Sequence, residues 1–221
     1  MAAVALNDQR FERQRRQLVE IIRDKGIENL EILRAFSTVP RHLFLPTAVE
    51  HRAYEDAALP IGFGQTTSQP SLQALFMERI ELEPTDRVLE VGTGMGYQTA
   101  VLAQLVSRVY SIDRIPELTL RARAVLDSLR IANVALLTGD GTVGWSRYAP
   151  FDAILVAAGA PEIPAALVTQ LATGGRMLIP LGDRTEQQLT LVRKSETGVE
   201  TEELAGCAFV PLIGRFAWPA T

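Results

Sequence analysis

Val88-Leu89-Glu90-Val91-Gly92-Thr93-Gly94-Met95-Gly96-Tyr97 is the stretch of this 221-residue chain that decides its fold. It predicts a short apolar strand, then a turn with glycine at three alternate positions, and then the start of a helix. Glycine lets a backbone turn sharply and pass close to a ligand. We therefore expect a ligand at the carboxyl end of this strand, where open parallel sheets bind small molecules.

Strands and helices alternate on the C-terminal side of this turn. We expect strands at residues 87–91, 108–112, 134–137, 151–157 and 176–181, and helices at 97–105, 116–130 and 163–171. This alternation predicts an α/β fold with a mainly parallel, doubly wound sheet that helices cover on both faces. Two more strands, at 188–194 and 201–211, have no helix between them, so they are expected to form an antiparallel hairpin at the sheet edge.

The N-terminal side of the turn has a different pattern. Helices are expected at residues 8–24, 27–36 and 69–80, while Pro40 and Pro46 break the pattern in the irregular stretch 37–68. A loop of this length inside a compact unit usually has a function. We expect one domain over residues 1–221, in which 1–83 supply helices and a substrate loop and 84–221 supply the ligand-binding sheet and the hairpin.

The composition limits the class of protein. Hydrophobic residues make up 47% and charged residues 22%, as in an ordinary globular protein. The net charge is -4 and no long run of Lys or Arg occurs, so nucleic acid is not the expected partner. The apolar start is too short for a signal segment, and no stretch has the length of a membrane span, which favours a cytoplasmic location with no membrane partner. Cys207 is the one cysteine, so no disulfide and no metal cluster are expected.

Two acidic residues indicate the kind of ligand. Asp113 ends the second predicted strand, where a carboxylate can accept both ribose hydroxyls of a nucleoside. Asp140 follows the third strand, in Gly139-Asp140-Gly141. Each has a simpler alternative, because Asp113 could cap the next helix and Asp140 could start a turn. Together with the Gly-x-Gly-x-Gly spacing, the two acids resemble the class I S-adenosylmethionine-dependent methyltransferases, in which an acid at the second position faces the adenine amino group.

Further segments resemble one methyltransferase family, the protein-L-isoaspartate O-methyltransferases. They are Val39–Phe44, Tyr54–Asp56, Leu59–Gly62, Gly64–Pro70, the glycine turn, Gly139–Gly141 and Phe209–Leu212. The segment Gly-Gln-Thr-Thr-Ser-Gln-Pro at 64–70 is the specific part, because generic methyltransferases lack it. The resemblance runs from about residue 34 to residue 214, and the tail 215–221 does not align. Asp113 departs from the family pattern, which often has Glu there.

The resemblance implies a Rossmann-like class I methyltransferase fold with an N-terminal helical extension. It also implies methyl transfer from S-adenosyl-L-methionine to the free carboxylate of isoaspartyl residues in damaged proteins and peptides. The ester then collapses to a succinimide, which begins repair, and S-adenosyl-L-homocysteine is the other product. Ser68 would be the active-site residue and would contact the substrate together with Phe209, Val210 and Pro211. For the cofactor we expect contacts from Thr66, Thr67, Glu90, Gly92, Thr93, Gly94, Asp113, Arg114, Asp140 and Gly141.

The chemistry places few demands on side chains. A substrate carboxylate has a pKa of about 4, so it is ionised near neutral pH and needs no general base. Holding that carboxylate in line with the methyl group can supply roughly 7–11 kcal/mol of the barrier. The Ser68 hydroxyl and nearby amides could do this. Two alternatives for Ser68 are a helix N-cap and a nucleophile, but no Gly-x-Ser-x-Gly elbow surrounds it.

Three other functions compete with this one. A methyltransferase for a small molecule or RNA is disfavoured by the Ser68 segment and the acidic net charge. An NAD-dependent oxidoreductase is disfavoured by Asp140 and by the glycine spacing. A binding protein without turnover is disfavoured by the intact Ser68 segment. The sequence leaves the oligomeric state open, and a monomer is our working expectation.

Overall fold

The computed structural model describes residues 2–219, with side chains from Arg10 onward. Within this range, the strands β3 to β9 form one sheet in the order β5-β4-β3-β6-β7-β8-β9. The strands β5, β4, β3, β6 and β7 are parallel, and β8 runs antiparallel to both of its neighbours. Their bounds are β3 (Arg87–Val91), β4 (Arg108–Asp113), β5 (Val134–Thr138), β6 (Phe151–Val156), β7 (Leu171–Gly182), β8 (Gln187–Lys194) and β9 (Val199–Cys207). The predicted α/β fold with an antiparallel C-terminal hairpin is confirmed.

The strand order creates a crevice at the carboxyl ends of the central strands β3 and β6. From β3 the chain adds β4 and β5 on one side and then crosses to add β6 and β7 on the other. The loops that leave β3 and β6 therefore diverge, and open α/β sheets bind ligands at such a point.

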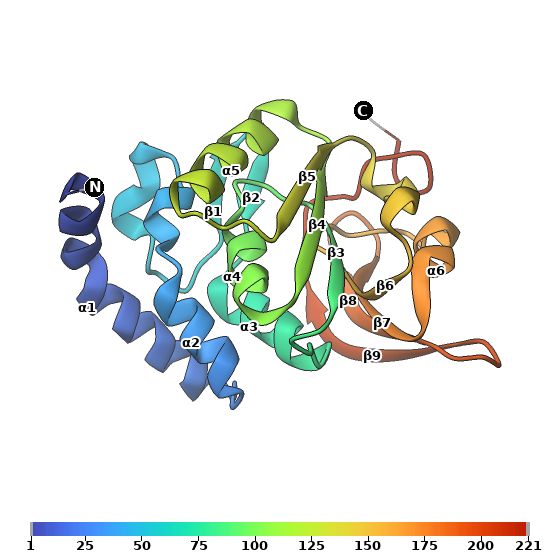
Figure 1. Ribbon diagram of the computed structural model, residues 1–221. Helices are drawn as coiled ribbons and strands as arrows, with labels where there is room; N and C mark the ends of the chain where they lie inside the picture. Colours follow the sequence, from blue (N-terminus) through green and yellow to red (C-terminus); the bar gives the residue numbers. More distant parts are fainter. Residues whose placement is uncertain (1, 220–221) are drawn as a thin grey trace.

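Helices cover the two faces of the sheet unequally. Five of them lie on one face, together with strand residues such as Val88 and Val109, while α6 covers the other beside Leu89 and Ile154 (Figure 1). Alternate strand residues thus belong to opposite cores. No helix within residues 2–219 is both long and apolar enough to cross a membrane. The helices are α1 (Ala2–Asp24), α2 (Leu30–Thr38), α3 (Pro70–Arg79), α4 (Tyr97–Leu105), α5 (Pro116–Ser128) and α6 (Ala165–Gln170).

The stretch predicted to be irregular, 37–68, has more structure than expected. It contains 3-10 helices at Arg41–Phe44 and Thr47–Arg52, and a hairpin of β1 (Leu59–Gly62) and β2 (Gln65–Thr67). The hairpin turn needs three successive positive φ angles, of 92°, 54° and 67°, at Gly62, Phe63 and Gly64. In β1 only Leu59 and Ile61 alternate as buried apolar residues, and β2 has no apolar residue, so the pattern is too short to mark either strand in the sequence.

Other boundaries differ for local reasons. The second helix begins at Leu30, three residues later than expected, because the Asn29 side chain accepts hydrogen bonds from Glu31 N and Ile32 N. The last strand ends at Cys207 rather than Pro211. The chain then turns across the carboxyl edge of the sheet, where Gly159 N donates to Val210 O at 2.8 Å and Leu212 N donates to Gly159 O at 2.8 Å.

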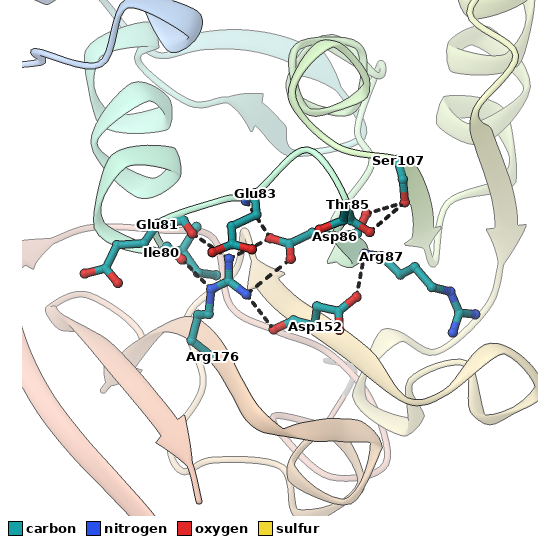
Figure 2. Close-up of polar contacts among 9 residues, drawn as sticks. All are labelled: Ile80, Glu81, Glu83, Thr85, Asp86, Arg87, Ser107, Asp152 and Arg176. Carbon is teal, nitrogen blue, oxygen red and sulfur yellow. Dashed lines mark hydrogen bonds and ion pairs between the residues drawn. The ribbon is translucent and has the colours of Figure 1, made fainter.

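A buried ion pair holds the opposite, amino edge of the sheet (Figure 2). Arg176 of β7 contacts Asp86, just before β3, at 2.6 Å, and their side chains are 12% and 6% exposed. Arg176 also donates to the carbonyls of Ile80, Glu81 and Asp152. The pair therefore connects β7 with the chain that enters β3, far from the glycine turn.

Candidate active site

The turn after β3 favours glycine at two positions. Gly92 and Gly94 have φ angles of 102° and 55°. A Cβ on Gly92 would lie 3.2 Å from Ala157 Cβ, and a Cβ on Gly94 would lie 3.2 Å from Ile61 Cδ1. The turn therefore packs closely against the end of β6 and the β1–β2 hairpin. Without side chains at these two positions, a ligand can approach its backbone.

Asp113 is fixed in place by backbone amides. Its Oδ2 accepts from Gly94 N at 2.7 Å and its Oδ1 accepts from Ile115 N at 2.9 Å. Burial raises the pKa of the Asp113 carboxyl, while these two amide hydrogen bonds oppose that rise. The N-cap residue of α5 is Ile115, so Asp113 does not cap that helix as the simpler interpretation proposed. Its carboxylate fixes the chain just before α5, and the residue lines the cavity at the end of β4.

One cavity lies where β3, β4 and β6 end. Aliphatic side chains form much of its wall, and Asp113 and Arg114 supply charged groups at one side. Such a lining suits an adenosyl group, whose base is largely apolar on its faces and whose ribose offers hydroxyl donors. The lining residues are Ile61, Gln65, Thr66, Val91, Gly92, Gly94, Ile112, Asp113, Arg114, Ile115, Leu118, Gly141, Ala157, Ala158 and Val210–Ile213. We call this space the adenosyl cavity.

A second cavity, of about 470 Å³, lies beside it between α3 and the chain after β9. Ser68, Gln69, Phe209 and Val210 line it, as do Cys207 and the α3 residues Leu72 and Leu75. We call it the peptide cavity. Thr66, Ala157 and Val210 line both cavities, so the two spaces share a wall.

A small hollow under the hairpin contains two polar atoms that sequence reasoning missed. Tyr97 Oη and Gln73 Oε1 are buried and have no hydrogen-bond partner among the described residues. Both residues line this hollow together with Thr67, Ser68 and Thr93. Buried polar atoms without a partner are rare, and here they leave room for a polar ligand group. The available signal was a glutamine among the apolar residues of a predicted helix.

Ser68 sits between β2 and α3, half-buried. The N-cap interpretation does not hold, because the N-cap residue of α3 is Gln69. Asp56 instead stabilises the start of this helix by accepting from Ser71 N at 2.8 Å. Neither His42 nor His51 lines any of the three spaces. This agrees with a reaction that needs no general base.

Glu90 lies beneath the glycine turn and outside these spaces. It is fully buried and accepts from Thr99 Oγ1 at 2.5 Å, Ser111 Oγ at 2.6 Å and Gln98 Nε2 at 3.1 Å. Burial raises its pKa to about 7, although these three hydrogen bonds oppose the rise. Glu90 therefore connects β3 with α4 and β4 next to the glycine turn. Thr93 of the turn joins the same network through its hydrogen bond with Ser111, at 2.6 Å.

Asp140 also lies outside the adenosyl cavity, although Gly141 lines it. Its Oδ1 accepts from Thr142 N at 2.9 Å, and its Oδ2 accepts from Arg215 N at 2.7 Å. Partial burial opposes ionisation, but the bonds from Arg215 and Thr142 outweigh it and lower the pKa of Asp140. A Cβ on Gly214 would collide with this carboxylate. Asp140 thus forms the turn that the simpler interpretation proposed and holds the C-terminal segment over the cavity.

The remaining predicted site residues are brought together. Thr66, Gly92, Gly94, Arg114 and Gly141 line the adenosyl cavity, with Val210 and Pro211 on its wall. Thr67 and Thr93 line the small hollow. Ser68, Phe209 and Val210 line the peptide cavity.

Comparison with known proteins agrees with this geometry. The sequence model of a family described as protein-L-isoaspartate(D-aspartate) O-methyltransferase (PCMT) matches residues 13–217. A protein-L-isoaspartate O-methyltransferase of Trichlorobacter lovleyi is 51% identical over 205 residues, which cover 92% of this chain and 94% of that protein. A solved protein-L-isoaspartate O-methyltransferase gives a TM-score of 0.85 at 32% identity, over 92% of this chain and 67% of that one. A PCMT structure from Plasmodium falciparum, in complex with S-adenosyl-L-homocysteine, gives 0.78 at 26% identity, over 89% and 97%.

Proposed function

This chain belongs to the protein-L-isoaspartate(D-aspartate) O-methyltransferase family, and from that premise we propose how its residues carry out the reaction. It is an S-adenosylmethionine-dependent enzyme that methylates the free carboxylate of isoaspartyl residues in proteins. The ester then forms a succinimide, which begins repair. S-adenosyl-L-homocysteine is the product left from the cofactor.

The residues of the adenosyl cavity fit the cofactor. When bound, S-adenosylmethionine supplies an electrophilic methyl group on a sulfonium. Asp113 would accept hydrogen bonds from the ribose hydroxyls, and the open turn at Gly92 and Gly94 would allow close approach of the backbone. The unpartnered atoms of Tyr97 and Gln73 support the fit, because a polar end of the cofactor would satisfy them. Thr66, Thr67, Thr93, Arg114 and Gly141 would complete the site, while Glu90 and Asp140 would act by holding the turn and the C-terminal segment.

Ser68 would hold the substrate carboxylate. Its hydroxyl and the neighbouring loop amides would donate to one carboxylate oxygen and leave the other directed at the methyl group. Binding should be modest, because the carboxylate loses its charge in the transition state and strong ground-state binding would slow transfer. Phe209, Val210 and Pro211 would flank the peptide.

The observation that carries this proposal is the wall that the peptide and adenosyl cavities share, with Ser68 beside it. The test uses two peptides that differ only in carrying isoaspartate or aspartate at one position, with methyl-labelled S-adenosylmethionine. Base-labile label should appear in the isoaspartyl peptide alone. Ser68→Ala should lower labelling more than it lowers cofactor affinity. A cofactor-binding protein that labels neither peptide would contradict the proposal.

The proposed function is accompanied by expectations about location, oligomeric state and partners. We propose a cytoplasmic monomer that is one domain over residues 1–221, modifies proteins and binds neither nucleic acid nor membranes. The net charge of -4 supports the expectation of no nucleic-acid partner. Sedimentation velocity at micromolar concentration should give a single species near the 24.2 kDa chain mass.

A further inference from the structure

Arg41 is a fully buried cation whose guanidinium binds backbone carbonyls. Its Nη1 donates to Ala53 O at 2.9 Å and to Glu55 O at 3.0 Å. Its Nη2 donates to Ala57 O at 3.2 Å and to Ser68 O at 3.2 Å. One side chain therefore joins the loop at residues 53–57 to the carbonyl of the active-site serine.

Arg41 also lies close to the aromatic ring of Tyr97. Its guanidinium carbon lies 5.5 Å from the centre of the Tyr97 ring, and Tyr97 begins α4 directly after the glycine turn. Yet Arg41 itself lines none of the three spaces. It touches the segments that carry substrate and cofactor contacts without reaching either ligand.

The loop at 53–57 is held a second time, beyond Ser68. Asp56 accepts from Lys25 Nζ at 2.6 Å, from Gln69 Nε2 at 2.9 Å and from Ser71 N at 2.8 Å. Two contacts therefore fix the chain at Ser68. Arg41 binds the carbonyl of Ser68, and Asp56 binds the side chain of the next residue, Gln69. Of these two contacts, the one made by Arg41 is also close to the Tyr97 ring.

Arginine suits this place better than lysine. Its planar fork presents five donors in fixed directions, whereas the lysine ammonium has three donors on a flexible stem. Burial lowers the pKa of the Arg41 guanidinium, and the nearby Tyr97 and Asp56 oppose that change. Burying a cation is costly, and the four carbonyl contacts of Nη1 and Nη2 offset part of that cost, while the buried Nε has no partner among the described residues.

We propose that Arg41 is a positioning residue for methyl transfer, which fixes the Ser68 backbone relative to the glycine turn so that carboxylate and methyl group meet in line. This inference rests on the proposed role of Ser68. Displacement of a reacting group by about 1 Å can cost about 100-fold in rate. Loss of the clamp should therefore reduce turnover more than cofactor binding.

The test compares Arg41→Lys with Arg176→Lys, a matched control. Arg176 is also a largely enclosed arginine, with a side chain 12% exposed and three carbonyl partners, but it lies at the amino ends of the strands (Figure 2). Both proteins are assayed at a temperature where each is fully folded. Arg41→Lys should lower kcat on the isoaspartyl peptide about 10- to 100-fold, with affinity for S-adenosyl-L-homocysteine within about threefold of wild type. Arg176→Lys should keep wild-type kcat.

A double-mutant cycle separates positioning from general loosening. If Arg41 acts through Ser68, Arg41→Lys should have little further effect on kcat in a Ser68→Ala background. Arg41→Gln, which keeps two donors and needs no buried charge, replaces the lysine variant if that one does not fold. Wild-type kcat in a folded Arg41 variant, equal loss in Arg176→Lys, or additive losses with Ser68→Ala would overturn the inference. Failure of the wild type to label the peptide would instead overturn the proposed function.

Discussion

At the scale of single residues, Asp113 combines a structural and a ligand-binding position in one carboxylate. Its two oxygens accept from Gly94 N and Ile115 N, and the residue also lines the adenosyl cavity. Each oxygen has a further lone pair for a ribose hydroxyl. The turn, the following helix and the cofactor are thereby set in relation to one another by one side chain.

Asp113→Ala should weaken binding of S-adenosyl-L-homocysteine by about 10- to 100-fold, since hydrogen bonds to a charged group contribute about 1.5–3 kcal/mol. Isothermal titration measures the change. Asp127→Ala, on the exposed surface of α5, is the control and should leave the affinity unchanged. Equal affinity in the Asp113 variant and the wild type would count against the site as described.

Glu90 should make stability depend on pH. Its pKa is about 7 in the folded protein against an ordinary value of 4.5, so between these values only the unfolded chain loses the proton. The free energy of unfolding should therefore fall as pH rises from 4.5 to about 7, by up to about 1.4 kcal/mol per pH unit from this group, and then level off. Urea unfolding across this range measures it.

Glu90→Gln removes the titrating proton and should flatten that pH dependence. Glu31→Gln, at an exposed position of α2, should retain the wild-type slope. Identical slopes in all three proteins would show that Glu90 does not titrate as its burial indicates.

At the scale of elements, the chain after β9 forms the roof of the adenosyl cavity. Val210–Ile213 line it, and Asp140 holds the segment through Arg215 N. Gly214→Ala would push a Cβ into the Asp140 carboxylate and shift this roof. We expect at least about 10-fold weaker cofactor binding. Gly139→Ala, whose Cβ would meet only Leu137 Cγ at 3.9 Å, should bind normally, and equal behaviour of both variants would contradict the roof's role.

The ion pair at the amino edge belongs to the same scale, because it connects β7 to the entry of β3. Arg176→Met leaves Asp86 buried without its partner and should cost about 3–5 kcal/mol of unfolding free energy. The double variant Arg176→Met/Asp86→Leu should regain much of that loss. Arg193→Met, which breaks the exposed pair with Glu81, should cost less than about 1 kcal/mol by urea denaturation. Similar losses for Arg176→Met and Arg193→Met would remove the reason for assigning the buried pair this role.

At the scale of the whole molecule, sequence reasoning recovered what depends on local periodicity. The strands around Val88 and Val109 and the glycine turn follow from apolar runs and from glycine spacing, and the structure has them within a residue or two. The resemblance supplied Ser68. What it could not supply depends on contacts across the chain, such as Arg41 reaching Ser68 over 27 positions.

Asp140 shows the same limit. Its place after the third strand was clear, but whether its carboxylate faces the adenosyl cavity depends on a tail that lies 75 residues further on. Glu90 similarly lies on the strand face that packs against α4, a direction set by the partner helix rather than by the motif. Packing over such sequence distances leaves no periodic pattern for a single sequence to reveal.

The wall shared by the two cavities also has a thermodynamic consequence. Thr66, Ala157 and Val210 line both cavities. If a ligand in one cavity orders these residues, a ligand in the other cavity binds at a lower cost in conformational entropy. The two ligands should bind with positive cooperativity. Linkage then requires that S-adenosyl-L-homocysteine raise the affinity for an isoaspartyl peptide by the same factor by which the peptide raises the affinity for S-adenosyl-L-homocysteine.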